Sequence, residues 1–329
     1  MSRFSKITVF VTAATLCFAC FALAGCSSGN SGGGSSEGAG KSSSVSFTPQ
    51  TTPIQANGIY TYGLQSDGTL ITSAEVTGGG NVVSTYGDFT KWKDISSFST
   101  SSEGVAAILK GGSVVYCGGL VDELSNSDLK DVSKWSDVVQ IAFGKHDIIG
   151  LKSDGSIVCA GTISTSELGD TKGYVQVECG CYPMAVKADG TVKVFKWSWA
   201  DAPIDKVSSW TDIKSVSSSW DHIVALKSDG TVVAAGSNAY GECEVGGWTD
   251  IVAVSAGMNF TLGLKSDGTV VAAGLNENGQ CDVGSWTGIA AIDAGYYHSV
   301  GMKSDGTVVA SGANWQGQCN VSGWGLKAQ

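Results

Sequence analysis

Apolar and polar residues follow a repeated arrangement of short strands along most of the chain. In "WTDIVAVSAG" (248–257), a nearly continuous apolar run rich in small side chains predicts a strand that is buried on both faces. "TLGLKS" (261–266) and "TVVAAG" (269–274) predict two more strands, with a two-residue hairpin at Asp267-Gly268, since a type I′ turn has positive φ at both central positions. No long segment has the 3.6-residue periodicity of an amphipathic helix. We therefore expect an all-β chain with about three strands per unit.

The same phrase returns at regular intervals. "LKSDGTVVAAG" occupies 226–236 and 264–274, and "MKSDGTVVASG" occupies 302–312. Weaker copies extend toward the N-terminus, and the hairpin glycines lie 35–44 residues apart at Gly68, Gly112, Gly155, Gly190, Gly230, Gly268 and Gly306. Seven units of this length are typical of propellers or solenoids.

The two ends of the repeated region indicate a closed ring. The last unit ends at Trp324 without a following first strand, whereas "ANGIYTYGL" (56–64) aligns with "AGMNFTLGL" (256–264). A linear solenoid needs capping units at its ends, and a ring does not. The sequence therefore predicts a seven-bladed β-propeller over residues 50–329, closed by an N-terminal strand that completes the last blade.

The repeat also resembles a known family. "GYYHSVGMKSDGTVVASGANWQGQ" (295–318) resembles the repeats of the regulator of chromosome condensation, with the pattern GxxH[ST] followed by LKSDGTVVAxGxNxxGQ. The short unit is most similar to the bacterial branch that includes the second-type β-lactamase inhibitory protein. The resemblance spans residues 50–324 and is strong over 208–324. It implies a binding propeller and names no particular partner.

The N-terminus predicts export and lipidation. A basic start with Arg3 and Lys6 precedes the apolar run 7–23, and "LAGC" (23–26) resembles the lipobox of bacterial lipoproteins. Residues 1–25 are thus expected to be a lipoprotein signal peptide, with lipid attachment at Cys26. The alternative is a transmembrane anchor, since about 17 apolar residues approach the lower limit for a membrane span.

Residues 26–49 form a Ser/Gly-rich flexible linker. The propeller would then sit in the bacterial cell envelope, on the outer side of the cytoplasmic membrane, with the lipid anchor as its only membrane contact.

Charge limits the partners. The net charge is −10, and it becomes −12 when Arg3 and Lys6 leave with the signal. Such an acidic domain repels phosphate, so nucleic acid is disfavoured. We expect a monomer whose partner is an extracellular protein, or else a glycan.

Residues that recur in several or nearly all blades are interpreted as scaffold; the tryptophan position holds Thr171 in one unit. Trp92, Trp135, Trp210, Trp248, Trp286 and Trp324 are expected to pack between blades, and the Asp of each "SDG" to form its turn. His222 and His298 are expected to hydrogen-bond within turns. The seven cysteines after Cys26 have no zinc-type spacing, so we expect small buried side chains, no metal and no cofactor. No catalytic motif is present, so enzyme activity is not expected.

Residues that differ between blades are the candidate site. The GxxH turns and the starts of the crossovers should emerge on one face, and eight aromatic residues occupy their variable positions or the fourth unit's irregular loop. They are Tyr182, Trp197, Trp199, Trp220, Tyr240, Tyr296, Tyr297 and Trp315. Aromatic patches on loops of a rigid scaffold indicate binding. Protein binding is the first hypothesis; glycan binding and inhibition of a cell-wall or β-lactam-hydrolysing enzyme are the alternatives.

Overall fold

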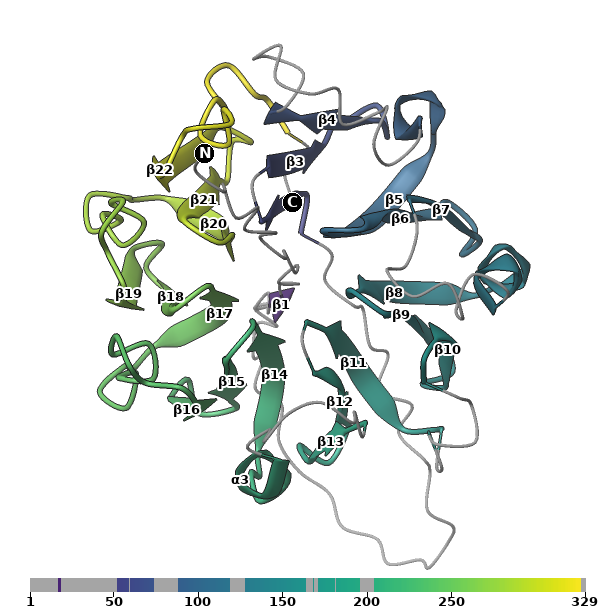
Figure 1. Ribbon diagram of the computed structural model, residues 1–329, viewed down its shortest axis with the longest axis horizontal. Coiled ribbons are helices and arrows are strands. Elements are labelled where there is room, and N and C mark those ends of the chain that lie inside the picture. The colour runs from purple at the N-terminus through teal and green to yellow at the C-terminus, as the bar shows by residue number, and fades with distance from the viewer. Residues whose placement is uncertain are drawn as a thin grey trace, which may run out of the picture.

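The described part of the chain forms seven small antiparallel sheets. The computed structural model describes residues 17–18, 52–58, 60–73, 88–118, 128–163, 168, 171–180, 182–195 and 204–326. Most of the predicted signal and the whole of the predicted linker, including Cys26, lie outside these residues. Within them, each sheet contains three consecutive strands, and the sheets radiate around a common centre (Figure 1). The predicted seven-bladed all-β propeller is confirmed.

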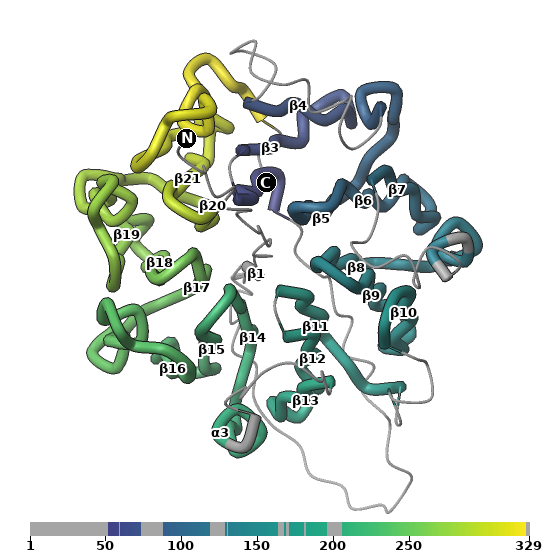
Figure 2. The backbone as a smooth tube through the Cα atoms, viewed as in Figure 1, coloured from purple at the N-terminus to yellow at the C-terminus, as the bar shows by residue number. Residues whose placement is uncertain are grey.

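Blades 1–7 are numbered in chain order, and the backbone passes once round the ring (Figure 2). Their strands are β2 (Ile54–Asn57), β3 (Tyr60–Leu64) and β4 (Leu70–Thr72); β5 (Ile95–Ser101), β6 (Gly104–Leu109) and β7 (Val114–Gly118); β8 (Val138–Phe143), β9 (Asp147–Lys152) and β10 (Ile157–Gly161); β11 (Tyr174–Cys179), β12 (Pro183–Lys187) and β13 (Val192–Val194); β14 (Ile213–Ser218), β15 (His222–Lys227) and β16 (Val232–Gly236); β17 (Ile251–Gly257), β18 (Phe260–Lys265) and β19 (Val270–Gly274); β20 (Ile289–Ala294), β21 (His298–Lys303) and β22 (Val308–Gly312). In addition, β1 (Cys17–Phe18) pairs antiparallel with β17.

Helical structure is confined to short turns between blades. The described elements are η2 (Phe89–Lys91), η3 (Asp128–Lys134) and α3 (Ile204–Ser208). Each immediately precedes or lies close to one of the recurrent tryptophans. Among the residues that the structure describes, no helix has the length and apolar character needed to cross a membrane.

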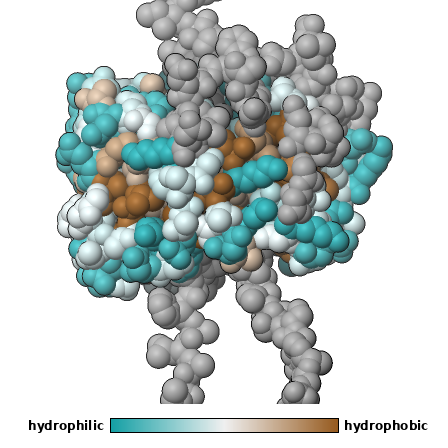
Figure 3. All heavy atoms as spheres, turned by 90° about the horizontal axis from the view of Figure 1, so that it is seen from below, coloured by the Kyte–Doolittle hydropathy of each residue, from teal (hydrophilic) through white to brown (hydrophobic). Residues whose placement is uncertain are grey.

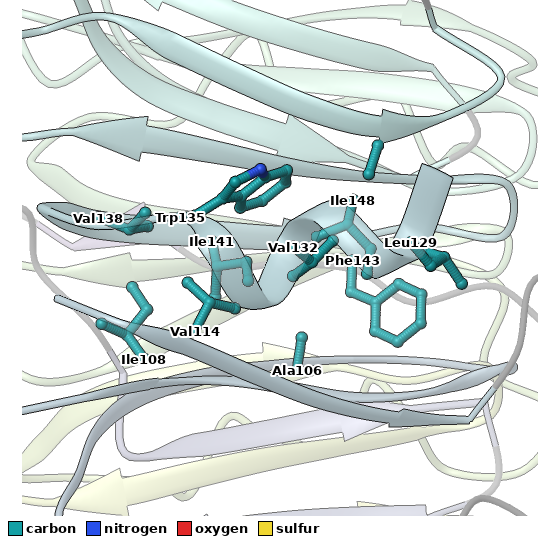
Figure 4. Close-up of a cluster of buried hydrophobic side chains, with 11 residues drawn as sticks. Ala106, Ile108, Val114, Leu129, Val132, Trp135, Val138, Ile141, Phe143 and Ile148 are labelled. Atoms are coloured by element: carbon teal, nitrogen blue, oxygen red, sulfur yellow. The ribbon is translucent and has the colours of Figure 1, made fainter. Parts of the chain in front are cut away.

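The recurrent tryptophans pack at the junctions between blades, as predicted. Trp135 lies in a cluster with Ile108 and Val114 of blade 2 and Ile141 of blade 3, and Figure 4 shows these side chains meeting across the junction. Its ring is accommodated by the second strand of its own blade, where a Cβ on Gly150 would come 3.2 Å from it. The aligned residue is Gly or Ala in every blade. A small residue at this point therefore makes room for the wedge.

Side chains of the innermost strands link neighbouring blades. At each junction, a side-chain oxygen of one inner strand accepts a backbone N–H from the inner strand of the next blade. The seven pairs are Gln55–Thr100, Ser99–Phe143, Gln140–Val177, Glu178–Ser218, Ser217–Ala256, Ser255–Ala294 and Asp293–Ala56, with donor–acceptor distances of 2.7–3.3 Å. These bonds form a continuous belt around the ring, and they satisfy backbone groups that are buried.

The ring is closed by a different terminus from the one predicted. We expected the N-terminal strand to complete the last blade, but β2 pairs with β3 inside blade 1, and blade 7 has all three of its own strands. Instead, Leu326 forms an antiparallel bridge with Gln65, which directly follows β3 in blade 1. The Leu326 N–H donates to the Gly306 carbonyl at 3.0 Å. Ile289 makes the equivalent bond to Gly268 in the preceding blade. The C-terminus thus supplies the missing start of the first inner strand.

Seen edge-on, the ring presents hydrophilic side chains with apolar patches between them (Figure 3). On the outermost strands, apolar side chains alternate in burial. Val233, Val271 and Val309 are partly buried, whereas the preceding Val232, Val270 and Val308 are buried.

Candidate interaction face

The GxxH turns and the crossover starts emerge on one face, as predicted. In blade 6 the Leu275 N–H donates to the Asn259 carbonyl at 2.8 Å, which joins the start of the crossover to the turn. Ala313 and Tyr297 make the same contact in blade 7. We call this side the loop face. The opposite side, which carries the Asp-Gly turns, is called the hairpin face.

The crossovers of blades 5–7 are held by one repeated set of bonds. In blade 7 the Asn314 Oδ1 accepts the Cys319 N–H at 2.9 Å, and the Gln318 Oε1 accepts the Gln316 N–H at 2.8 Å. Blades 5 and 6 repeat both bonds, with Glu242 in the position of the glutamine in blade 5. This role of the Asn and the Gln was missed in the sequence, although "NxxGQC" recurs there. The bonds fix the crossover tips, whose side chains are free to vary.

The cysteines of these crossovers are only partly buried, whereas the sequence predicted buried side chains. The Sγ atoms of Cys243, Cys281 and Cys319 lie 3.0–3.2 Å from carbonyl oxygens of their own loops. Burial raises the pKa of each of these thiols to about 11. Cys243, Cys281 and Cys319 form no disulfide bond, and no group of three or more potential metal ligands occurs among the described residues.

The two GxxH histidines tie adjacent blades together. His222 Nε2 lies 2.8 Å from Thr261 Oγ1 of blade 6, and His298 Nε2 lies 3.0 Å from Thr61 Oγ1 of blade 1. Both rings are fully buried. Desolvation lowers the pKa of His298 to about 3, so this ring is neutral at physiological pH. Both histidines form hydrogen bonds as predicted, but these Nε2 bonds join adjacent blades and do not stay within the turn.

Four of the predicted aromatic residues form a row on the loop face. The ring centroids of Trp220 and Tyr296 are 6.5 Å apart, those of Tyr296 and Tyr297 are 6.1 Å apart, and those of Tyr297 and Trp315 are 5.7 Å apart. Trp220 Nε1 also donates to the Tyr296 hydroxyl at 3.0 Å. We call these four residues the aromatic row. It runs from the turn of blade 5 to the crossover of blade 7.

Exposure differs sharply along the row. Tyr296 is only 2% exposed, whereas Trp315 is 67% exposed, and Trp220 and Tyr297 are intermediate. The expectation that every candidate ring faces solvent is therefore wrong for Tyr296, because its neighbours enclose it on both sides. Tyr296 instead fixes Trp220 by edge-to-face packing and a hydrogen bond.

The other candidate residues lie elsewhere. Tyr240 is 53% exposed at the crossover tip of blade 5. Tyr182 is 9% exposed and packs in the cluster between blades 4 and 5, so it too is wrong as a solvent-facing ring. Trp197 and Trp199 lie outside the described residues. Tyr240 and Trp315 are thus the prominent exposed aromatics of the described chain.

The hairpin face is uniform by contrast. Asp267 Oδ1 accepts both the Thr269 N–H at 2.9 Å and the Thr269 hydroxyl at 2.6 Å. The same pair of bonds recurs at Asp67, Asp154, Asp189 and Asp229. These bonds lower the pKa of each of the carboxyls, with the Thr or Ser hydroxyl as the main cause. The predicted turn role of these aspartates is confirmed, but the predicted two-residue type I′ turn is wrong. Gly268 has a φ of 78°, whereas Asp267 keeps a negative φ, and the Lys265 N–H donates to the Thr269 carbonyl at 2.9 Å across a three-residue loop.

Comparison with known proteins agrees with this architecture. Residues 213–242, 251–280 and 289–318 each match the regulator of chromosome condensation (RCC1) repeat. No curated protein sequence matches the chain.

Several solved structures are similar in fold. Prp20p from Saccharomyces cerevisiae has a TM-score of 0.53 and 16% identity, over 70% of this chain and 75% of that one. The CRINKLY WD40 ectodomain of the Arabidopsis thaliana receptor kinase ACR4 has a TM-score of 0.54 and 14% identity, over 80% and 94%. Human WBSCR16 has a TM-score of 0.50 and 16% identity, over 71% and 80%. The chain is therefore an RCC1-like seven-bladed propeller in which blades 5, 6 and 7 carry recognisable RCC1 repeats.

Proposed function

We propose that the protein is a lipid-anchored binding module of the bacterial cell surface, which binds another protein through the loop face. The observation behind this proposal is the aromatic row, which ends in the exposed Trp315 ring on a crossover fixed by hydrogen bonds. Tyr and Trp are the usual anchors of protein interfaces, because they bury a large area at a low cost in conformational entropy.

The scaffold supports a binding role. Side chains that vary in type stand on crossovers whose backbone bonds repeat, and this is how rigid folds carry binding residues. Prp20p, which shares the fold, has reported binding properties toward Gsp1p and histones. That similarity supports a protein partner in general terms. It does not identify one for this chain.

The location rests on the N-terminal sequence. The apolar segment that ends in "LAGC" supports lipidation at Cys26 and anchoring on the outer side of the cytoplasmic membrane. The Ser/Gly stretch would give the propeller a reach of roughly 20–25 Å from the membrane surface. No enzymatic activity, metal or cofactor is part of the proposal.

A glycan is the second candidate, and the exposed Trp315 indole is the observation that favours it, since a flat apolar ring can stack on a sugar. Inhibition of a cell-wall or β-lactam-hydrolysing enzyme would be a special case of protein binding. It rests on resemblance alone.

The test is capture by the full chain at the native cell surface after crosslinking. Trp315→Ala should abolish capture of a specific protein while thermal unfolding is unchanged. Tyr296→Phe should weaken it partly, because Trp220 loses its hydrogen-bond acceptor. Ser266→Ala, at an exposed position of the hairpin face, is the matched control. Equal capture by the Trp315→Ala and Ser266→Ala variants would contradict the proposal. The glycan would be favoured if tryptophan fluorescence changes when polysaccharides are added but not when candidate proteins are added.

A further inference from the structure

The loop face of blades 5–7 has an unusual distribution of charge. Its segments are 219–221, 237–247, 258–259, 275–285, 295–297 and 313–323, all within the described residues, and they contain no Lys or Arg. They contain five carboxylate residues, of which Glu242 is fully buried; Asp221, Glu244, Glu277 and Asp282 reach the surface. The surface around the aromatic row is therefore acidic and aromatic at once.

The lysines of these blades are on the other side. Lys227, Lys265 and Lys303 stand at the hairpin ends of the second strands, where each pairs with the first residue of an inner strand. Lys214 lies at the same end of blade 5. The "LKSDG" phrase puts its lysine beside the hairpin, next to an aspartate. In these blades the hairpin face therefore carries both signs of charge, whereas the loop face carries carboxylates without lysines.

One of the carboxylates lies next to the row, and a second lies on the crossover that packs against blade 7. Asp221 follows Trp220 directly, and its side chain is 31% exposed, with Oδ1 3.2 Å from His222 Nδ1. Glu277 is exposed at the crossover tip of blade 6. That crossover lies against blade 7, because the Gly279 carbonyl accepts from Ser311 Oγ at 2.7 Å and the Gln280 carbonyl accepts from Ser299 Oγ at 2.6 Å. No Lys or Arg of the described chain forms a salt bridge with either carboxylate.

We propose that the aromatic row and its flanking carboxylates bind a basic polypeptide segment, rich in Lys or Arg, of the partner protein. This inference rests on the proposed function and specifies the partner's chemistry. Cations are attracted to the faces of Trp and Tyr rings, and the attraction grows when water is excluded. Asp221, beside Trp220, and Glu277, on the crossover that packs against blade 7, supply negative charge near the row. The aliphatic part of a Lys or Arg side chain can then pack on the rings while its charged group meets a carboxylate. An acidic segment or a phosphate backbone would be repelled by the same groups.

The experiment uses the full chain and three synthetic peptides. One consists of lysine, arginine and glycine; the second has glutamine in place of every basic residue, and the third has glutamate. Binding is followed by tryptophan fluorescence and calorimetry at low and at physiological ionic strength. The basic peptide should bind at least about ten-fold more tightly than the glutamine peptide, and its affinity should fall with salt. Equal binding of the basic and glutamine peptides would overturn the inference.

Variants separate a specific site from general attraction to an acidic protein. Trp315→Ala should weaken binding of the basic peptide by about ten-fold or more, and Glu277→Gln and Asp221→Asn by about three-fold or more each. Asp250→Asn makes the same change of charge on the hairpin face, at a residue with φ of 61° that Asn tolerates. It should leave the affinity unchanged. An equal loss in Asp250→Asn and Glu277→Gln would mean that only net charge matters, and would contradict the site.

The outcomes distinguish the two proposals. If Trp315→Ala abolishes capture of the native partner but no basic peptide binds, the proposed function stands and the basic segment is wrong. If Trp315→Ala affects neither capture nor peptide binding, both are wrong. A response to polysaccharides alone would also overturn the inference, because a neutral sugar has no cationic group.

Discussion

The hairpin face and the loop face are built by the same strands but differ in what their repeats hold constant. On the hairpin face both backbone and side chains repeat: an aspartate accepts from the second residue after it in five blades with the same two bonds. On the loop face the bonds repeat and the tips change, so that Tyr240, Asn278 and Gln316 occupy one position in successive blades. Constant bonds with varied tips indicate a surface shaped for recognition.

The difference is most sharply tested with two tryptophans. Trp286 is buried at the junction of blades 6 and 7, and Trp315 is exposed on the loop face. Trp286→Ala should lower the free energy of unfolding by about 3–5 kcal/mol, because it leaves a cavity between blades. Trp315→Ala should change it by less than about 0.5 kcal/mol and yet abolish partner binding. Urea unfolding and capture measured on both variants check this, and a strongly destabilised Trp315→Ala variant would erase the distinction.

A glycine pair compares the backbones of the two faces. Gly268 in the hairpin has φ of 78°, and an added Cβ would lie 3.2 Å from the backbone of Gly288 and Ile289. Gly279 in the crossover has φ of 81°, but the nearest atom is the side-chain Oδ2 of Asp282 at 3.0 Å, which can move. We expect Gly268→Ala to lower the free energy of unfolding by about 2 kcal/mol and Gly279→Ala by about 1 kcal/mol, because alanine is strained in the left-handed backbone conformation at both positions. If thermal unfolding shows equal losses of stability in the two variants, the hairpin backbone adapts to the added Cβ as readily as the Asp282 side chain does in the crossover.

Acid should affect the two sides at different pH. His298 is neutral when folded, with a pKa of about 3, whereas an unfolded histidine binds a proton near pH 6.5. The unfolded state therefore binds more protons, and stability should fall as the pH is lowered from about 6.5, by at most about 1.4 kcal/mol per pH unit. The hairpin aspartates have lowered pKa values, so their contribution is lost only below the ordinary Asp value.

His298→Gln isolates the histidine contribution. Urea unfolding of this variant should show a flatter pH dependence between about pH 6.5 and 4 than that of the native chain. Burial raises the pKa of Asp293, which has the opposite effect on the slope and is present in both proteins, so the difference between them belongs to His298. Identical slopes would contradict the assignment.

The smallest effect is expected at the crossover thiols. Cys243, Cys281 and Cys319 have pKa values of about 11 because of burial, so they are protonated at neutral pH. Alkylating reagents should therefore label them slowly in the folded protein and rapidly in urea. Fast labelling of the folded chain, followed by mass spectrometry, would show that the loop face is more open than these contacts imply.

Much of the fold could be predicted because it depends on residues that recur at a fixed spacing. The Asp-Gly hairpins, the tryptophan wedges and the turn histidines each have one residue type in several blades. The structure places all three as expected, although the hairpins are three-residue loops and not type I′ turns. The belt of inner-strand bonds could not be predicted, because Gln, Ser, Glu and Asp all serve as its acceptors and only the register between blades aligns them.

The candidate site was predicted only in part. The sequence indicates which residues emerge on the loop face, and it places Trp220, Tyr297 and Trp315 correctly there. It does not reveal that Tyr296 is enclosed by two other rings, because that depends on side-chain contacts between turns 76 residues apart. The direction of closure was missed for a similar reason: the alignment of 56–64 fixes where β2 belongs in a repeat, but not which terminus fills the gap.

The seam between the last and first blades sets an order of events during folding. Ala56 donates to Asp293, 237 positions later in the chain, and Leu326 completes the edge of blade 1. Blades 2–6 can form from neighbours as they emerge, whereas blade 1 keeps an open edge until residues 289–326 have been synthesised. Contacts so distant in sequence form slowly, and an open edge can pair with other chains. Chains truncated before residue 289 should therefore aggregate rather than form smaller rings.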